Sequence, residues 1–524
     1  MKKIFSVFLS LLLFVICSRA ESAQPTVSTS LGKVVGVEKE GLRIFKGIPY
    51  AKPPVGELRF APPQSIGPWT SPLDATEYGP AAIQIRREEN LDMSEDCLTL
   101  NIWTPAEAGE SDRLPVYVYI HGGAYALGTG SDAMYDAASF ARQGIVAVTI
   151  NYRLNAMGFL AGRATFDKYG TTGNWGHLDQ IMALEWLRDN VAAFGGDPGK
   201  VTVGGESAGS YSVSALILSP LAKGLFHGAI MESGTILGAA ATSYYAKCDL
   251  ARSIELGKML SSVFHADDNA EGLAGLRQAD ATVLAQLAQF RWDQTSLAPF
   301  PLMPVFDGKV IPENPYKALK DGTFNKVRVL WGFNRDEGSI FVPETTSEPT
   351  YAMLAAINCG NDNARAVLAR FPVDADHPAF RRVRRLLAYT GFTAGMKTFA
   401  DAAVAQGLDV YAYNFNYVSP KDAAGGLGAR HAAELPYVFN NLHVEGLKEP
   451  EQQALADEMH LRWGNFIKTG DPNQGVKLPT NIQWPKYNSQ NSDVMRFDTS
   501  VTVGTLPDKE DMEFMERLLI LPWL

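Results

Sequence analysis

A serine between glycines is the strongest chemical signal in this chain. The run Gly205-Glu206-Ser207-Ala208-Gly209 follows a short β-rich segment and precedes an apolar stretch with helical spacing. A G-x-S-x-G pattern between a strand and a helix is typical of a sharp turn that presents a serine nucleophile. Small neighbours let the strand and the helix approach closely, and the first amide groups of the helix favour nearby negative charge. We therefore expect Ser207 to be a nucleophile.

A serine hydroxyl is a weak nucleophile unless a base takes its proton. His431 follows a predicted strand at 410–418 and the glycine-rich loop 425–428, and the end of a late strand is where the base is expected. His443 is a weaker alternative, twelve residues further on. The two remaining histidines in this half of the chain are His377, which has no strand before it, and His460, which lies in a helical stretch.

The base needs a carboxylate that fixes its tautomer and stabilises the imidazolium. In hydrolases with this elbow the chain order is serine, acid, histidine, which limits the search to residues 208–430. Asp336 and Glu337 directly follow a predicted strand at 327–333. Either carboxylate would serve, and spacing alone does not choose between them.

A second glycine motif lies upstream of the elbow. His121-Gly122-Gly123-Ala124-Tyr125 follows a predicted strand at 116–120. The tetrahedral intermediate of an ester carries an oxyanion, and losing one preorganised N–H donor to it costs roughly 100- to 1000-fold in rate. Small residues let the backbone itself supply these donors. The motif therefore predicts an oxyanion hole.

The elements that position these residues alternate between strand and helix. Strands are expected at 116–120, 145–150, 201–203, 327–333 and 410–418, and helices at 179–194 and 208–218. Apolar strands alternating with helices indicate an α/β fold, with a mostly parallel central sheet and helices on both faces. The stretch 240–300 is helical and poor in motifs, so it is a candidate cap beside the site. No repeat or low-complexity linker divides the chain, and we expect one domain over residues 21–524.

The first twenty residues resemble a secretory signal peptide. Lys2-Lys3 is followed by an apolar run at 4–16, and Ser18-Arg19-Ala20 offers a cleavage site after Ala20. The apolar run is shorter than the ~20 residues that a membrane-spanning helix needs. Cys17 leaves a lipoprotein as a weaker alternative, because a bulky isoleucine precedes it. We therefore expect export to the periplasm or the medium, without stable membrane insertion.

Charge and cysteine content exclude some classes of function. Loss of the signal would take the formal net charge from −10 to −13, which argues against nucleic acid as a partner. Cys97, Cys248 and Cys359 would remain, so at most one disulfide can form, and the sequence does not say which. No C-x-x-C or H-E-x-x-H motif is present. We expect no metal site, no cofactor and no protein partner.

Together these motifs resemble the type-B carboxylesterase family, which includes the cholinesterases. The resemblance covers nearly the whole mature chain. Beyond the motifs above, it rests on Phe45-Lys46-Gly47-Ile48-Pro49-Tyr50-Ala51, Pro53-Pro54-Val55-Gly56, Ser94-Glu95-Asp96-Cys97-Leu98-Thr99-Leu100-Asn101-Ile102, Asn151-Tyr152-Arg153 and Phe194-Gly195-Gly196-Asp197-Pro198. Several long motifs in the family order are more specific than any one of them. The resemblance implies an α/β-hydrolase domain that hydrolyses small-molecule carboxylic esters through an acyl-enzyme.

The resemblance also implies roles for individual residues. It selects Glu337 rather than Asp336 as the triad acid, in a stretch that resembles the family's N-x-D-E-G, and it selects His431 as the base. Glu206 resembles a buried family glutamate whose role near the site is electrostatic.

The resemblance implies that the backbone N–H groups of Gly123, Ala124 and Ala208 hold the oxyanion. The family often has glycine where Ala124 stands, but alanine keeps the N–H group. Phe300 is a candidate for the acyl pocket by a looser match.

The chain departs from the family pattern in two places. Cys97 matches a family half-cystine, but the region around 81–83 offers no partner, so that bridge is not expected. Arg87, beside Arg86, stands where cholinesterases carry a tryptophan that holds a quaternary ammonium by cation–π attraction. This argues against choline esters and suggests a substrate that carries a carboxylate; the alternative is a solvated pair of loop arginines.

Two other classes of function stay open at this stage. One is a lipase that acts at lipid surfaces, and the other is a non-catalytic binding protein with a hydrolase fold. Retention of all three triad candidates argues against the second.

Overall fold

A mixed sheet of eleven strands organises the part of the chain that the computed structural model describes, residues 24–85, 91–241, 248–288 and 302–520. The strand order is β16-β15-β14-β13-β12-β11-β9-β10-β8-β4-β3. These strands are β3 (Val37–Lys39), β4 (Leu42–Pro49), β8 (Thr99–Pro105), β9 (Leu114–Ile120), β10 (Val146–Ile150), β11 (Gly196–Glu206), β12 (Gly228–Glu232), β13 (Arg328–Asn334), β14 (Val410–Phe415), β15 (Asp493–Phe497) and β16 (Thr502–Thr505). Short strands outside this sheet are β1 (Thr26–Thr29), β2 (Gly32–Val35), β5 (Leu73–Asp74), β6 (Ala81–Ala82) and β7 (Met93–Ser94).

The middle of the sheet is parallel and its two edges are antiparallel. Strands β10, β9, β11, β12, β13, β14 and β15 pair in parallel. Antiparallel pairs join β8, β4 and β3 at one edge and β16 at the other. The carboxyl ends of parallel strands meet at one edge of a sheet, and ligand sites in such folds lie there. The loops after β9, β11, β12, β13 and β14 therefore converge.

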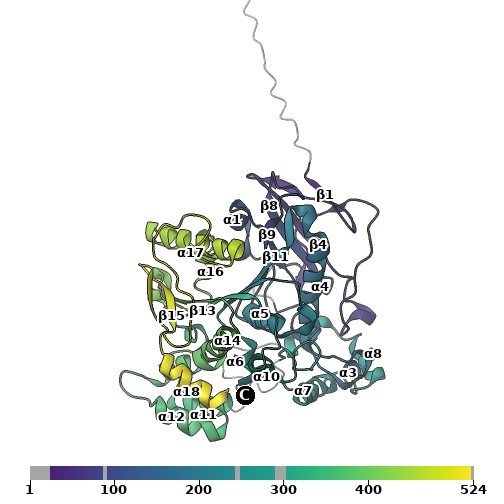
Figure 1. The fold of residues 1–524 in the computed structure, drawn as a ribbon. Coiled ribbons are helices and arrows are strands. Elements are labelled where there is room, and N and C mark those ends of the chain that lie inside the picture. The colour runs from purple at the N-terminus through teal and green to yellow at the C-terminus, as the bar shows by residue number, and fades with distance from the viewer. Residues whose placement is uncertain (1–23, 86–90, 242–247, 289–301, 521–524) are drawn as a thin grey trace, which may run out of the picture.

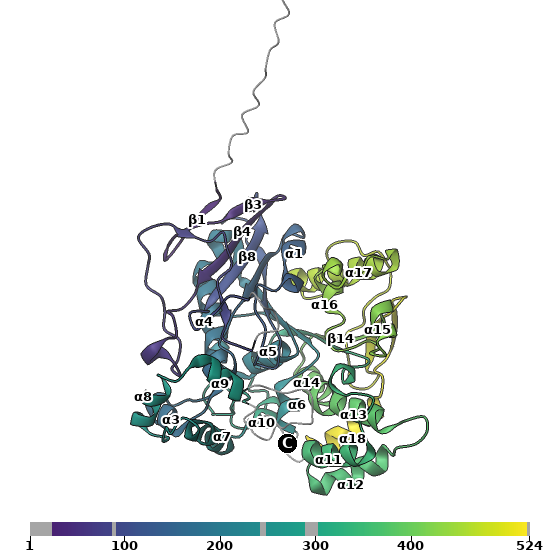
Figure 2. The same ribbon diagram turned by 180° about the vertical axis from the view of Figure 1, so that it is seen from behind.

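Helices cover both faces of the sheet (Figures 1 and 2). On one face lie α1 (Ala138–Arg142), α16 (Leu435–Val438) and α17 (Pro450–Thr469), and on the other lie α4 (Trp175–Asn190), α5 (Ala208–Leu218) and α14 (Ala394–Ala405). Successive side chains of β9 point to opposite faces of the sheet. Val116 and Val118 belong to one buried cluster, and Tyr117 and Tyr119 to the other. The α/β fold with a doubly covered sheet, expected from the sequence, is confirmed.

The other helices gather at the ends of the strands and around the rim. They are α2 (Asn155–Phe159), α3 (Arg163–Tyr169), α6 (Ile236–Ala241), α7 (Leu250–Ser262), α8 (Ala270–Leu276), α9 (Ala281–Leu287), α10 (Pro315–Lys320), α11 (Glu348–Cys359), α12 (Asn361–Arg370), α13 (Ala379–Leu387), α15 (Pro420–Ala424) and α18 (Lys509–Leu519). In both views α3, α7 and α8 lie together at one lower corner, and α11, α12 and α18 at the other. Helices α7–α9 occupy part of the stretch expected to form a cap; residues 242–247 and 289–301 lie outside the described part.

The predicted elements match the structure in type and differ in extent. Helix α5 has the bounds expected, whereas the predicted helix 179–194 begins earlier, at Trp175, and becomes a 3₁₀ turn at Val191–Phe194. The short strand expected at 201–203 is part of β11, which starts at Gly196. Gly196 and Pro198, at its start, lie where the pairing with β9 is irregular.

The structure describes the three cysteines and most of the chain outside the predicted signal peptide. Cys97, Cys248 and Cys359 are buried free thiols in the structure. Within the described ranges no helix is both long and apolar enough to cross a membrane, and no three histidine, cysteine or acidic side chains are grouped to hold a metal ion. The predicted signal peptide, residues 1–20, lies outside the described residues.

Candidate active site

Ser207 sits at a strained turn between β11 and α5. Its backbone has φ 56° and ψ −123°, a conformation that costs a non-glycine residue about 1–3 kcal/mol and clusters at functional sites. Its N–H group donates to the carbonyl of Glu232 at 2.9 Å, which fixes the turn to the neighbouring strand. A Cβ on Gly209 would lie 2.0 Å from the carbonyl oxygen of Ile120, so only glycine lets α5 pack directly on the end of β9.

Glu337 orients the imidazole of His431. Oε2 of Glu337 lies 2.5 Å from Nδ1 of His431, and the Glu337 side chain is fully buried. The other oxygen, Oε1, accepts from the Ser233 hydroxyl at 2.6 Å and from the Asn334 N–H at 2.7 Å. Since both oxygens are engaged, the carboxylate holds the proton of the imidazole on Nδ1 and leaves Nε2 as the basic atom.

The neighbouring carboxylate, Asp336, turns elsewhere. It accepts from the Ala429 N–H at 2.9 Å and pairs with Arg335 at 2.9 Å. Its contact with Ala429 ties the turn after β13 to the loop that carries His431. The structure therefore brings Glu337, and not Asp336, to the imidazole.

The second ring nitrogen of His431 faces another acid. Nε2 lies 3.1 Å from Oε1 of Glu206, but neither atom has a hydrogen-bond partner in the described part of the chain. The rings of Phe341 and Phe392 cover the imidazole, with centroids 5.4 and 4.6 Å away. No hydrogen bond joins the Ser207 hydroxyl to the imidazole among the described residues; such bonds often tighten only when substrate is bound.

Three further carboxylates are buried near His431 without enough partners. Burial raises the pKa of Glu206 to about 8 and that of Glu434 to about 7, and it raises the pKa of Glu232 well above the usual range. Glu232 accepts from the Trp463 indole at 2.9 Å. One oxygen of each carboxylate has no hydrogen-bond partner in the described chain, so negative charge there is expensive.

Two of these acids, Glu206 and Glu434, act on the imidazole together with Glu337. Burial by itself would lower the pKa of His431, but the negative charges of Glu206, Glu337 and Glu434 outweigh burial and raise the pKa to about 9. The imidazolium is therefore well stabilised, as it must be while the serine proton resides on it.

The glycine loop after β9 lies against the elbow. A Cβ on Gly122 would be 3.2 Å from Cβ of Ser207, so the two segments are in direct contact. Gly123 and Ala124 both have positive φ, 107° and 56°. Their N–H groups donate to no acceptor within the described ranges, and the Ala208 N–H is in the first turn of α5, where amides lack an intrahelical partner. The Gly123 and Ala124 amides are therefore unpaired in the described chain, one and two residues after the contact with Ser207.

The remaining sequence candidates are not brought into the site. His377 is exposed and pairs with Asp374 at 2.9 Å, His443 is exposed, and Nδ1 of His460 lies 2.8 Å from the Val438 carbonyl. Arg87 and Phe300 lie outside the described residues, so their predicted substrate contacts stay predictions.

Four residues of this site had no role assigned from the sequence: Glu232, Ser233, Asn334 and Glu434. Glu232 ends β12, the strand beside the elbow, Ser233 directly follows it, and Asn334 ends β13. A polar residue at the end of a buried strand is a signal that could have identified them. Glu434, three residues after His431, gave no such signal, because its burial depends on the fold of the whole loop.

The fold and site together define an α/β-hydrolase. A serine on a strand-to-helix elbow, an acid after β13 and an imidazole after β14 meet at one edge of a parallel sheet, in the chain order of that class.

The chain belongs to the carboxylesterase family, whose model matches residues 23–515. It is 35% identical to the para-nitrobenzyl esterase of Bacillus subtilis (strain 168) over 506 residues, which cover 92% of this chain and 97% of the relative. It is 34% identical to carboxylesterase 1D of Rattus norvegicus, over 93% of this chain and 92% of that protein. A solved structure of PNB esterase superposes with a TM-score of 0.81 at 32% identity, covering 94% of this chain and all of the other. The chain is therefore a carboxylic ester hydrolase.

Proposed function

We propose that Ser207, His431 and Glu337 form the catalytic triad of this esterase and that it cleaves small-molecule carboxylic esters through an acyl-enzyme. The observation that carries the proposal is the engagement of both Glu337 oxygens, one on Nδ1 of His431 and one on Ser233 and Asn334. This arrangement presents Nε2 of a buried imidazole as a base at the sheet edge that carries the strained serine.

The reaction begins when Nε2 of His431 accepts the proton of the Ser207 hydroxyl. Oγ attacks the ester carbonyl, and the oxyanion that forms accepts from the N–H groups of Gly123, Ala124 and Ala208. The imidazolium gives its proton to the departing alcohol, and the acyl group stays on Oγ. Water then attacks the acyl-enzyme with the same base, which releases the carboxylic acid and restores the serine.

Glu206 supports this cycle through charge rather than by touching the ester. Its carboxylate lies 3.1 Å from Nε2 of His431, so it stabilises the imidazolium most strongly when the ring has taken the serine proton. A neutral acid at this position would stabilise the imidazolium less.

A serine-directed organophosphate tests the assignment of the nucleophile. We expect mass mapping to find the phosphonyl group on Ser207, and Ser207→Ala to lose both the label and, by ~10⁶-fold, kcat. Ser233→Ala is the matched control, because it removes a nearby buried hydroxyl that donates to Glu337. Its labelling of Ser207 should persist, and a label on Ser233 in the wild type would refute the proposal.

A lipase acting at lipid surfaces is the alternative that substrate profiling decides. A soluble esterase hydrolyses short p-nitrophenyl esters best and gains nothing from emulsified lipid. Preference for long acyl chains, together with activation by an emulsion, would favour the lipase.

The predictions for Arg87 and for export each need their own experiment. If Arg87 binds a substrate carboxylate, Arg87→Ala should reduce kcat/KM for an anionic ester more than for its neutral analogue; equal losses would contradict this.

If residues 1–20 are a signal peptide, the exported protein should begin at Glu21, as N-terminal sequencing would show.

A further inference from the structure

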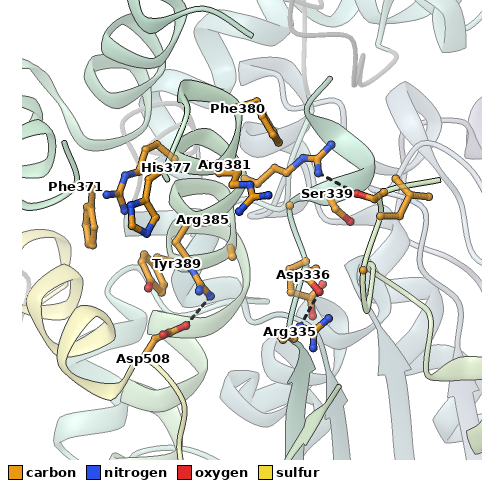
Figure 3. A pocket seen from close by; sticks show the side chains of 18 of the residues that line it. Arg335, Asp336, Ser339, Phe371, His377, Phe380, Arg381, Arg385, Tyr389 and Asp508 are labelled. Carbon is orange, nitrogen blue, oxygen red and sulfur yellow. Dashed lines mark hydrogen bonds and ion pairs between the residues drawn. The ribbon is translucent and has the colours of Figure 1, made fainter. Parts of the chain in front are cut away.

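A cavity of about 730 Å³ borders the turn that carries Glu337. Its walls are the turn 335–339, helix α13 with the segment before it, and the start of α18, whereas Ser207, Glu206 and His431 do not line it. Figure 3 shows Arg381 and Arg385 on one helix and Arg335 with Asp336 on the turn across the cavity. Of the three proposed triad residues, Glu337 alone lines this cavity.

Five arginines and five acids line this cavity, which we call the arginine pocket. The five arginines are Arg335, Arg381, Arg382, Arg384 and Arg385. Two of them have close carboxylate partners: Arg385 pairs with Asp508 at 2.5 Å, and Arg335 with its sequence neighbour Asp336 at 2.9 Å. Arg382 lies 3.7 Å from Asp374.

Arg381 and Arg384 have no such compensation. They are three residues apart on α13, so they share a face of the helix, and both guanidinium groups lie over the Phe380 ring, at 5.9 and 5.0 Å from its centroid. Arg384 donates only to backbone carbonyls, at 3.0 Å to Val342 and 3.3 Å to Gly426. Neither arginine forms an ion pair with any carboxylate in the described part of the chain. Two like charges thus face the cavity together.

The acids that line the same cavity form no ion pair with Arg381 or Arg384 in the described chain, although the negative charges of Glu344 and Asp336 counteract the fall that burial causes in the pKa of Arg384. Asp511 accepts from Arg370 at 2.7 Å and from Tyr389 at 3.1 Å. Glu337 is directed to His431 and Ser233, and Glu344 is exposed, with no ion pair to an arginine among the described residues. The pocket therefore keeps cationic groups available.

A second cavity, of about 440 Å³, adjoins the first. It shares Arg335, Arg385 and Asp508 with the arginine pocket and adds Arg496. Nε of Arg496 is buried without a hydrogen-bond partner in the described chain. Arg335 thus lines both cavities, and its ion pair with Asp336 stands between them.

We propose that the arginine pocket binds a small organic anion with at least two carboxylate or phosphate groups, one held by Arg381 and Arg384 and the other by Arg335. The planar guanidinium fork matches both oxyanions and binds them through paired, charge-assisted hydrogen bonds. The distinct walls of the pocket favour an anion with separated charges over a single small ion. The proposal does not depend on which ester the enzyme cleaves.

Occupation of the pocket would stabilise the protein around the triad acid. A Cβ on Gly338 would lie 2.1 Å from the Arg384 carbonyl oxygen, so the Glu337 turn packs on the backbone of α13. Arg384 also holds the carbonyl of Gly426, in the loop that leads to His431. A ligand on Arg384 and Arg335 therefore links three segments, and binding to the native state alone must raise Tm.

Calorimetric titration of the full chain tests the proposal with two probes, citrate for carboxylates and inorganic pyrophosphate for phosphates. We expect at least one probe to bind with 1:1 stoichiometry and to raise Tm. Arg381→Gln should weaken Kd tenfold or more and remove the Tm increase. Arg365→Gln is the matched control, because it removes one exposed arginine of the neighbouring helix α12, outside the pocket; its Kd should equal that of the wild type.

Two further measurements exclude simpler explanations. Sodium chloride at matched ionic strength should not reproduce the Tm increase, and protein phosphonylated on its active-site serine should bind the probe unchanged. Equal Kd values for Arg381→Gln and the wild type, binding by neither probe, or loss of binding on phosphonylation would each overturn the proposal. Which of the two probes binds tells carboxylate from phosphate as the preferred group.

Discussion

The buried ion pair of Arg153 and Asp179 and the buried acids around His431 differ in how completely their polar atoms are hydrogen-bonded. The guanidinium of Arg153 and the carboxylate of Asp179 are both nearly inaccessible, and they form two hydrogen bonds with each other, of 2.8 and 2.7 Å. Arg153 donates further to the Ala61 carbonyl, and its own N–H binds Asp179. Around His431, at similar burial, Glu206 and Glu434 each keep an oxygen without a partner in the described chain.

This difference in hydrogen bonding distinguishes an ion pair that stabilises the fold from a site that carries out a reaction. A buried charge is tolerated when its hydrogen-bonding capacity is filled, as it is at Arg153. The carboxylates near His431 leave capacity unfilled, and this raises the free energy of the resting site while stabilising the imidazolium that forms during reaction. We therefore expect changes at Arg153 to act on stability and changes around His431 to act on rate.

Among the variants that test this comparison, Glu337→Gln should have the largest effect. The amide cannot accept the Nδ1 proton and stabilise the imidazolium in the same way, so kcat should fall by about 10⁴-fold, as when a triad acid becomes an amide. Asp336→Asn is the control, because its side chain does not reach His431; steady-state kinetics should show a loss below about tenfold. Similar losses for both variants would remove the distinction between the two carboxylates.

Arg153→Met should give the next largest effect, on stability alone. It leaves Asp179 buried and unpaired, which costs about 3–5 kcal/mol of unfolding free energy. Arg142→Met is the control, since Arg142 and Glu40 form an exposed pair that contributes about 0–1 kcal/mol. Denaturant unfolding measures both, and the folded Arg153→Met enzyme should keep its kcat. A large fall in kcat without destabilisation would contradict the assignment of the Arg153–Asp179 pair to stability rather than to the reaction rate.

Glu206→Gln should shift the pH dependence of the reaction. His431 must be neutral to take the serine proton, so kcat/KM rises with pH as the imidazole loses its proton. Carboxylates raise the pKa of His431 to about 9, so the acidic limb of the wild-type profile should lie above the ordinary histidine value of about 6.5. Removing the charge of Glu206 lowers that pKa and moves the limb to lower pH. An unchanged limb would show that Glu206 does not act on the imidazole.

At about pH 5, Glu232→Gln should give the smallest effect, a gain in stability of about 1 kcal/mol that grows as the pH rises. The folded-state pKa of Glu232 is raised by burial, so above about pH 4.3 the unfolded chain loses this proton first, and wild-type stability falls as pH rises, by up to about 1.4 kcal/mol per pH unit. Glutamine keeps an acceptor for Trp463 and has no proton to lose. Thermal unfolding across pH should show the variant gaining on the wild type, whereas Glu313→Gln, at an exposed position, should show no such trend.

The sequence predicted what depends on local pattern. Ser207 was recognisable because the elbow needs small residues at fixed offsets, and the bounds of α5 followed from the same motif. The parallel strands were visible as apolar runs. Their full lengths were not, because β11 begins in a stretch with a glycine and a proline, where its pairing with β9 is irregular.

The residues that tune the site depend on contacts far apart in the chain. Neighbouring carboxylates at 336 and 337 look alike in sequence, and only the fold turns one toward His431 and the other toward Ala429. The burial of Glu434 and the uncompensated charge of Arg381 have the same origin. Each depends on which distant side chains arrive nearby, and a single sequence does not give that information.

The parallel order of the sheet has a consequence for how this enzyme gains activity during folding. The reacting groups follow β9, β11, β13 and β14, so they come together only when all four strands have joined the sheet. A truncated or partly assembled chain that stops before β14 would bind no acyl group, however native its first half. Recovery of ester turnover after dilution from denaturant therefore reports completion of the central sheet rather than of any one segment.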